Sequence, residues 1–228
     1  MHDDLTVHSF FYYLTEVEGV EWRTQDWQAN KIVHAVKGDD IKGYFDIGVG
    51  GKRRTFDLKN INEFIPLLMN TVAARIGDII NGEFEIIPIP SSDATVTSKD
   101  EFRTLVHARH IAAAVGQRAT ALPALRWKRA KLSARRGGSR DPQVHFENLA
   151  IVQKPTKPIV IFDDVMTTGS QMIAAARRLD AAEVDLICGV VVGRATKQQR
   201  PKMMGWATED VPLIERPIDW DAIFGPSA

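Results

Sequence analysis

The residues best suited to chemistry stand in one short stretch, where two acids follow an apolar run and precede hydroxyl groups and a glycine. Asp163 and Asp164 come directly after the apolar residues 159–162, and Thr-Thr-Gly-Ser follows at 167–170. Adjacent carboxylates can accept hydrogen bonds from neighbouring hydroxyl groups of a sugar. Hydroxyl and backbone N–H groups at the start of a helix can bind a phosphate, because the helix dipole is positive there. The stretch therefore predicts a sugar-phosphate site.

A purely structural interpretation of this stretch is that the acids end a strand while Thr-Thr-Gly turns and caps a helix. Capping needs only one such residue, whereas here two acids and three hydroxyl residues occur together. Gly169 would also let the backbone approach an anion without a Cβ in the way. We therefore favour the sugar-phosphate site.

A second candidate is the basic segment at residues 126–140. It holds seven Lys or Arg residues and no acid, in a chain whose 29 basic and 29 acidic residues balance. One interpretation is a solvated surface. Another is a loop hinged at its two adjacent glycines, whose cations Arg135, Arg136 and Arg140 screen a pyrophosphate and exclude water on closing. A third is a contact with single-stranded DNA, since Trp127 stands among the cations.

A third candidate follows an apolar strand predicted at 84–90. Pro90, Ser91 and Ser92 begin the loop after this strand. The loop is interpreted either as a plain turn or as a further part of a phosphate site.

The pattern of apolar residues predicts the elements that position these candidates. Strands are predicted at 43–49, 52–58, 84–90, 119–123, 158–162 and 184–192, and helices at 63–76, 99–117 and 170–179. The first two strands flank Gly50 and Gly51 as a hairpin, and the later alternation of strands and helices is typical of βαβ units. The fold class is therefore α/β, with a parallel sheet flanked by helices. We divide the chain into an N-terminal subdomain of hairpin plus helix (1–82), a core (83–195) and a C-terminal tail packed on the core (196–228).

The composition is that of a soluble globular protein. The chain has 228 residues, 44% apolar and 25% charged, with zero formal net charge, so no overall field attracts it to nucleic acid or anionic lipid. Its single cysteine, Cys188, excludes an intramolecular disulfide and suits a reducing compartment. No apolar run approaches the length of a membrane span, and the first residues lack the pattern of a signal peptide. We expect a cytoplasmic protein without membrane contact.

The stretch 159–170 resembles the phosphoribosyl pyrophosphate (PRPP) motif of the type I phosphoribosyltransferases, in which an apolar strand precedes two acids, two apolar residues and Thr-Thr-Gly-x-Thr. The resemblance implies a type I phosphoribosyltransferase-like sheet with an N-terminal hood, a variable segment that covers the acceptor. It implies that PRPP is bound by the run from the acids into the helix, namely Asp163, Asp164, Val165, Met166, Thr167, Thr168, Gly169, Ser170 and Gln171. Gln171 departs from the family, which usually has a hydroxyl residue there to hold the 5′-phosphate.

The other parts of that family fall on the remaining candidates. Pro90, Ser91 and Ser92 occupy the place of the pyrophosphate loop, and the basic segment occupies that of the flexible catalytic loop. The resemblance implies that the catalytic residues are the two acids and three arginines, Asp163, Asp164, Arg135, Arg136 and Arg140. Mg²⁺ is implied as the cofactor, held mainly by substrate oxygens and waters rather than by protein ligands.

Within the family, the chain resembles most closely the ComF-type, competence-associated members. This finer resemblance rests on residues 29–40, 87–90 and 143–150, in that order. Many ComF-type proteins begin with a four-cysteine zinc module, which this chain lacks. The implied function is transfer of a phosphoribosyl group to an unidentified, nucleobase-like acceptor with release of pyrophosphate. The alternative is a non-catalytic protein of the same fold that senses PRPP or serves DNA uptake, with its basic loop on single-stranded DNA. A homodimer stays open, since many relatives dimerise.

Overall fold

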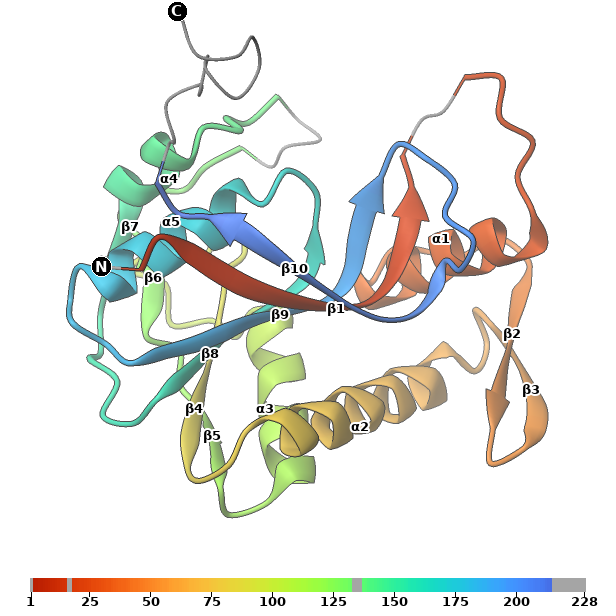
Figure 1. The fold of residues 1–228 in the computed structure, drawn as a ribbon, viewed down its shortest axis with the longest axis horizontal. Coiled ribbons are helices and arrows are strands. Elements are labelled where there is room, and N and C mark those ends of the chain that lie inside the picture. The colour runs from red at the N-terminus through yellow and green to blue at the C-terminus, as the bar shows by residue number, and fades with distance from the viewer. Residues whose placement is uncertain (1, 16–17, 133–136, 215–228) are drawn as a thin grey trace, which may run out of the picture.

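The computed structural model describes residues 2–15, 18–132 and 137–214, and its central element is a six-stranded sheet (Figure 1). In spatial order its strands are β10 (Met204–Pro212), β1 (Asp4–Leu14), β9 (Leu186–Thr196), β8 (Ile159–Met166), β4 (Phe84–Pro88) and β5 (Ala119–Ala121). β10 runs antiparallel to β1, and every other neighbouring pair is parallel. The predicted α/β class with a mostly parallel sheet is confirmed.

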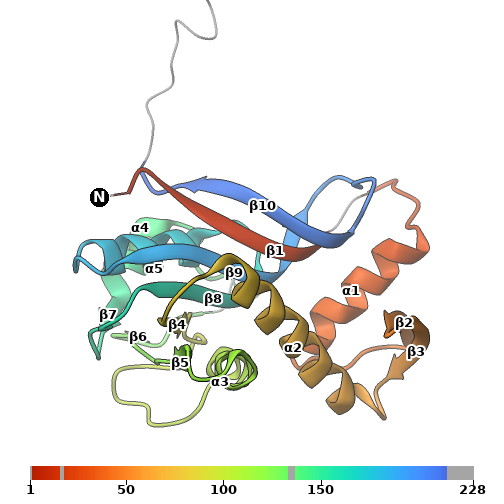
Figure 2. The ribbon, with the colours of Figure 1, turned by 60° about the horizontal axis from the view of Figure 1, so that its bottom comes forward.

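Helices pack on both faces of this sheet (Figure 2). They are α1 (Thr24–Val36), α2 (Ile61–Ile79), α3 (Arg103–Val115), α4 (Pro142–Asn148) and α5 (Ser170–Asp180). In β8, Val160 and Phe162 pack into the core that includes α1, α2 and α3, whereas Ile159 and Ile161 pack into the core on the α5 side. Burial on both faces explains why this strand is an unbroken apolar run. None of the helices in the described part of the chain is long and apolar enough to cross a membrane.

Two smaller sheets accompany the central one. β2 (Tyr44–Val49) and β3 (Lys52–Asp57) form the predicted hairpin, and both of its glycines have the positive φ that a tight primed turn requires. β6 (Leu125–Trp127) and β7 (Leu149–Ile151) pair antiparallel. The basic segment therefore begins within this small sheet, at Arg126 and Trp127.

Several boundaries differ from those predicted. The helix predicted at 63–76 continues as α2 to Ile79, because the backbone stays helical through Gly77 and becomes extended only at Ile80. The strand predicted at 158–162 continues as β8 to Met166, because β9 pairs with it up to Arg194. β1 and β10, from the two ends of the chain, also join the central sheet. The division into 1–82, 83–195 and 196–228 stays a prediction.

Candidate functional site

The candidate residues gather where the parallel strands β4 and β8 end. Pro88 lies beside Phe162 in register, and the N–H of Ile89 donates to the carbonyl of Phe162 over 2.9 Å. The loop that follows β4 therefore begins next to Asp163. The hydroxyl of Thr104, at the start of α3, fixes the loop further by donating to the carbonyl of Ile89 over 2.6 Å. In α/β proteins, this carboxyl edge of the sheet is where ligands bind.

The two acids of β8 have different surroundings. The carboxylate of Asp164 is 7% exposed and pairs with Arg103, whose Nε and Nη2 lie 2.7 and 2.5 Å from its Oδ2. Asp163 is partly exposed, and its Oδ1 accepts the backbone N–H of Asp164 over 2.8 Å. Burial and the adjacent charge of Asp164 raise the pKa of Asp163 well above its usual range. Asp163 is therefore the acid that offers a ligand the better access.

The loop from β8 into α5 is open to solvent at its hydroxyl residues. Thr167 and Thr168 are exposed, and the Oγ1 of Thr168 lies 3.1 Å from the Oγ of Ser170, the first residue of α5. Gly169 precedes the helix in the left-handed region, with φ 83°. A Cβ there would lie 3.5 Å from the sulfur of Met166, so the conformation rather than crowding calls for glycine. The loop presents hydroxyl groups and a helix N-terminus to an anion.

The remaining residues of the predicted PRPP run have unequal access to a ligand. Val165 is buried in one core and Met166 in the other, so their side chains anchor the start of the loop to the sheet. Gln171 is partly exposed in the first turn of α5. The side chain of Gln171 is therefore accessible to a ligand, whereas those of Val165 and Met166 are not.

The loop after β4 is tied to the start of the basic segment. The indole Nε1 of Trp127 donates to the carbonyl of Pro90 over 3.0 Å, and the N–H of Lys131 donates to the carbonyl of Ser92 over 2.9 Å. Within the loop, the Ser91 hydroxyl donates to Asp93 over 2.6 Å and so lowers the pKa of that carboxyl. These bonds give the predicted pyrophosphate loop a fixed shape beside the acids of β8.

The cations predicted from the basic segment are not all placed. Arg135 and Arg136 lie outside the described residues. Arg140 is exposed and directly precedes Asp141, which caps α4 by accepting the N–H of Gln143 over 2.8 Å. Among the described residues, no contact links Arg140 to the ends of β4 or β8. Its proposed role therefore requires movement of the segment.

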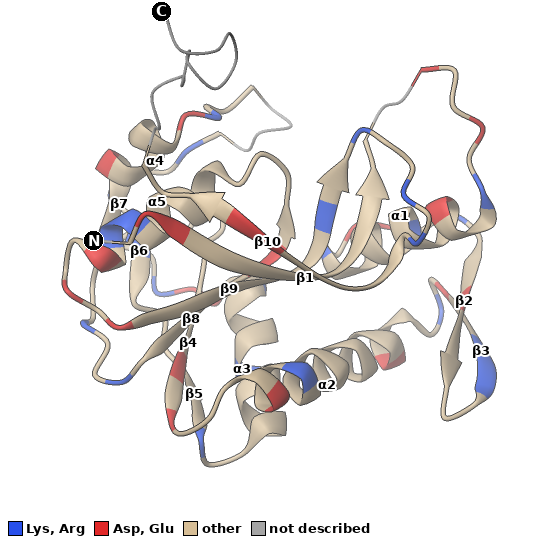
Figure 3. Cartoon of the chain, viewed as in Figure 1, with Lys and Arg blue, Asp and Glu red and all other residues tan. Residues whose placement is uncertain are grey.

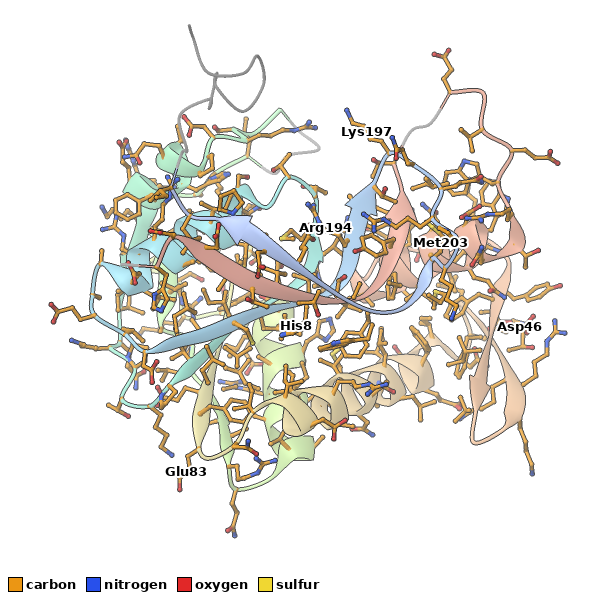
Figure 4. The ribbon with its side chains drawn as sticks, viewed as in Figure 1. His8, Asp46, Glu83, Arg194, Lys197 and Met203 are labelled. Carbon is orange, nitrogen blue, oxygen red and sulfur yellow. The ribbon has the colours of Figure 1, made fainter. Side chains whose placement is uncertain are left out.

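Three basic residues that are not among the predicted site residues lie at this edge. Arg103 pairs with Asp164, and Lys131 stands close enough to Asp163 for the two charges to act on each other. Arg194 extends from β9 (Figure 4), where its Nη1 donates to the carbonyl of Thr167 and its Nε pairs with Glu209 over 2.6 Å. Arg194 could have been suspected, because β9 adjoins β8 and Arg194 falls near its carboxyl end. Lys131 belongs to the predicted basic segment, whereas nothing local marks Arg103 as the partner of Asp164.

Acidic and basic residues are interspersed over the ribbon rather than separated on two faces (Figure 3). The described residues contain no group of three or more His, Cys, Asp or Glu side chains that could hold a metal ion. Cavities of about 490 and 650 Å³ lie elsewhere, and both are lined by Pro142, Arg177 and Ile214. Neither of these two cavities is lined by Asp163, Thr167 or Thr168.

Three known structures that partly resemble this chain are phosphoribosyltransferases. No family model matches the sequence, and no match was found among curated proteins. The chain resembles a hypoxanthine phosphoribosyltransferase from Staphylococcus aureus at 10% identity and a TM-score of 0.39, over 62% of this chain and 71% of that one. It resembles the adenine phosphoribosyltransferase (APRTase) from Giardia lamblia at 14% identity and a TM-score of 0.40, over 76% and 98% of the two chains. It resembles the adenine phosphoribosyltransferase from Saccharomyces cerevisiae at 13% identity and a TM-score of 0.37, over 71% and 87%. At these values neither a substrate nor a residue role carries over from them.

Proposed function

We propose that the chain binds PRPP at the carboxyl edge of its sheet and transfers the phosphoribosyl group to an unidentified, nucleobase-like acceptor, releasing pyrophosphate. The observation that carries this proposal is the sequence of groups along one loop. A partly exposed acid, Asp163, precedes two exposed hydroxyl residues, Thr167 and Thr168, and a helix N-terminus behind Gly169. An acid that accepts from sugar hydroxyls and a helix start that binds phosphate together suit a ribose 5-phosphate.

Charge placement supports transfer with pyrophosphate as the leaving group. Transfer breaks the bond between ribose C1 and the pyrophosphate oxygen, and the departing group takes the electron pair. The bond to the acceptor nitrogen forms at the same carbon, and the acceptor gives up its proton. Cations stabilise the charge that develops on the leaving oxygen. Lys131 stands at the pyrophosphate loop, and closure of the basic segment would add Arg135, Arg136 and Arg140.

Mg²⁺ fits this arrangement as a partner of the substrate. It prefers oxygen ligands and keeps several waters, and the described residues offer no group of three metal-binding side chains. Pyrophosphate oxygens and waters would therefore hold the ion, with Asp163 and Asp164 outside its first coordination shell. Bound in this way, the ion neutralises charge on the leaving group.

The acceptor would lie between the β8 loop and the N-terminal segment. In this proposal residues 1–82 act as the hood, with α1 against β1 and the β2–β3 hairpin farther out, against α1 and α2 (Figure 1). The ring centres of Trp22 and Trp27 lie 4.6 Å apart with their planes tilted by 42°, and Trp27 is 53% exposed. Both stand at the start of α1, whereas the end of α1 is the part that Arg103 joins to Asp164. These two rings are therefore not placed to stack on an acceptor at the β8 loop.

One observation favours a non-catalytic alternative in which the chain senses PRPP without turnover. Asp164 is already paired with Arg103, so a ribose must share that acid with a cation. The contact with single-stranded DNA is less well supported, because Trp127 has no exposed surface and donates to Pro90. A base cannot stack on a buried ring.

Calorimetry with Mg·PRPP tests the proposed site. Replacing both acids, Asp163→Asn with Asp164→Asn, removes charged acceptors worth about 3 kcal/mol together. Affinity should then fall roughly a hundredfold. Asp185→Asn, an exposed acid just before β9, is the matched control and should bind as the wild type does. Unchanged affinity in the double variant would remove the site from consideration.

A second measurement separates the enzyme from the sensor. Pyrophosphate release is followed with Mg·PRPP and a panel of purine and pyrimidine bases. Turnover with any base supports the transferase. Binding of PRPP without turnover across the panel supports the sensor.

A further inference from the structure

Arg103 touches both the candidate ribose site and helix α1. It is the first residue of α3, and its Nε and Nη2 lie 2.7 and 2.5 Å from the Oδ2 of Asp164. Its Nη1 donates over 2.8 Å to the carbonyl of Lys37, the residue that ends α1. One guanidinium therefore joins β8 to an element of the N-terminal segment.

A second side chain of α3 contacts the same end of α1. His107 lies one helical turn after Arg103, and its Nε2 is 3.2 Å from the carbonyl of Val36. His107 is buried, and burial lowers its pKa. The neutral ring therefore donates from Nε2 to that carbonyl at neutral pH. The last carbonyls of α1 are thus held from outside by two residues of one face of α3.

The charges explain why an arginine suits this position. Asp164 is a nearly buried carboxylate that needs a counter-charge, and the C-terminal carbonyls of α1 carry the negative end of the helix dipole. The planar guanidinium can donate to both, whereas an ammonium group is a single point charge. Asp164 and the carbonyl of Lys37 are therefore acceptors that share one cation.

We propose that Arg103 is a positioning residue that couples occupancy of the ribose site to helix α1. The proposal rests on the proposed function, because the occupant is the diol of PRPP. A hydroxyl that donates to Asp164 takes part of the carboxylate's acceptor capacity away from Arg103. The guanidinium then bonds more strongly to the carbonyl of Lys37, and the last turn of α1 becomes tighter. The stability of the last turn of α1, in the N-terminal segment, would thus depend on whether the sugar is bound.

Hydrogen exchange at the end of α1 measures this coupling. The informative amides are those of Lys37, Gly38 and Asp39, which donate to carbonyls in the last turns of α1. Saturating Mg·PRPP should slow their exchange at least about fivefold in the wild type, a typical coupling between sites. In Arg103→Gln, exchange should be faster without ligand, and saturating PRPP should no longer slow it. Arg103→Lys should give an intermediate response.

Two further variants make the result specific. Arg109→Gln removes another arginine of α3, which pairs with Glu101 instead, and it should respond to PRPP as the wild type does. Asp164→Asn removes the competing charge, so without any ligand it should slow exchange at the end of α1. That effect should vanish in the double variant with Arg103→Gln.

The outcomes separate the coupling from the proposed function. If calorimetry shows PRPP binding while α1 exchange is unchanged, or if Arg103→Gln responds like the wild type, the coupling is wrong. If the wild type does not bind PRPP, the proposed function fails. The ligand-free comparison of Asp164→Asn with the double variant then decides whether Arg103 links β8 to α1.

Discussion

The ammonium nitrogen of Lys131 lies 4.5 Å from the centre of the Trp127 ring. That ring has no exposed surface, and its Nε1 is bonded to the carbonyl of Pro90. The backbone of Lys131 is bonded to Ser92 in turn. Burial lowers the pKa of Lys131, and the nearby charge of Asp163 opposes that shift. Lys131 is therefore a fixed cation of the pyrophosphate loop, unlike an arginine on a solvated surface.

Lys131→Met should weaken Mg·PRPP binding roughly tenfold, or about 1.4 kcal/mol, because one positioned cation is lost. In the wild type, binding should also weaken at a pH lower than the ordinary lysine pKa of 10.5. Since the pKa of Lys131 lies below that of a free lysine, the ammonium loses its proton, and with it the charge, earlier in the titration. Calorimetry between pH 7 and 10 measures both effects.

Two variants control that experiment. Lys131→Arg keeps its charge across the range, so the loss of affinity at high pH should be smaller. Lys128→Met removes another lysine of the basic segment, whose Nζ is bonded to the carbonyl of Glu147, and should change affinity less than twofold. If Lys128→Met and Lys131→Met lose the same affinity for Mg·PRPP, the net charge of the basic segment matters and the position of Lys131 does not.

Gly169→Ala should lower the free energy of unfolding by about 1–2 kcal/mol, because the left-handed conformation is costly for any residue with a Cβ. The added methyl group meets only the sulfur of Met166 at an ordinary distance, so crowding adds little. Urea denaturation measures the change. Gly48→Ala, in β2 and with open space around it, is the control and should cause no such loss. Equal stability of the two variants would contradict the role given to φ.

Acid should destabilise the fold as the pH falls below 6.5. Burial lowers the pKa of His107 and of His145 below the ordinary value of 6.5. The unfolded chain then binds protons more readily than the folded one, so stability is lost as the pH falls through this range. His107→Gln should reduce the pH dependence by on the order of 1 kcal/mol. His110→Gln, at a partly exposed position in the middle of α3, serves as the control in denaturation at pH values above and below 6.5.

Strands that are buried on both faces can be predicted from the sequence. The run at 159–162 is apolar throughout because its side chains enter two cores, and the hairpin shows in its glycine pair. β1 has no comparable local signal of its place in the sheet. Its partners in β9 and β10 lie near the other end of the chain, as in the pairing of Val7 with Gly189 and Glu209. Pairing between strands so far apart in the sequence becomes visible only in the structure.

The same distinction holds at the candidate site. Asp163 and the hydroxyl residues after it are contiguous, so their chemistry is visible in the sequence. Arg103 stands 61 positions before Asp164, and a helix start gives no indication of where its side chain reaches. Lys131 is one of seven similar cations in its segment. Its contact with a buried indole, a tertiary feature, is what distinguishes it from them.

Asp163→Asn should separate stability from binding. The carboxylate of Asp163 is destabilised by burial and by the charge of Asp164, which is why its pKa is raised. A carboxyl whose pKa is raised on folding lowers stability at every pH above the pKa it has in the unfolded chain, and a neutral amide of the same shape carries no such cost. Asn keeps an oxygen that can accept the N–H of residue 164, so the local hydrogen bond survives. The free energy of unfolding should rise by on the order of 1 kcal/mol, while PRPP binding should weaken.

Denaturation and calorimetry at pH 7.5 measure the two effects on the same sample. Asp164→Asn supplies the contrast, because it leaves Arg103 without its carboxylate and should lower stability. The increase in the free energy of unfolding caused by Asp163→Asn should become smaller as the pH falls, because protonation of Asp163 in the wild type removes the same unfavourable charge. A loss of stability in Asp163→Asn at pH 7.5 would show that this acid is paired in the folded protein. A site that costs stability and serves binding is what functional carboxylates commonly display.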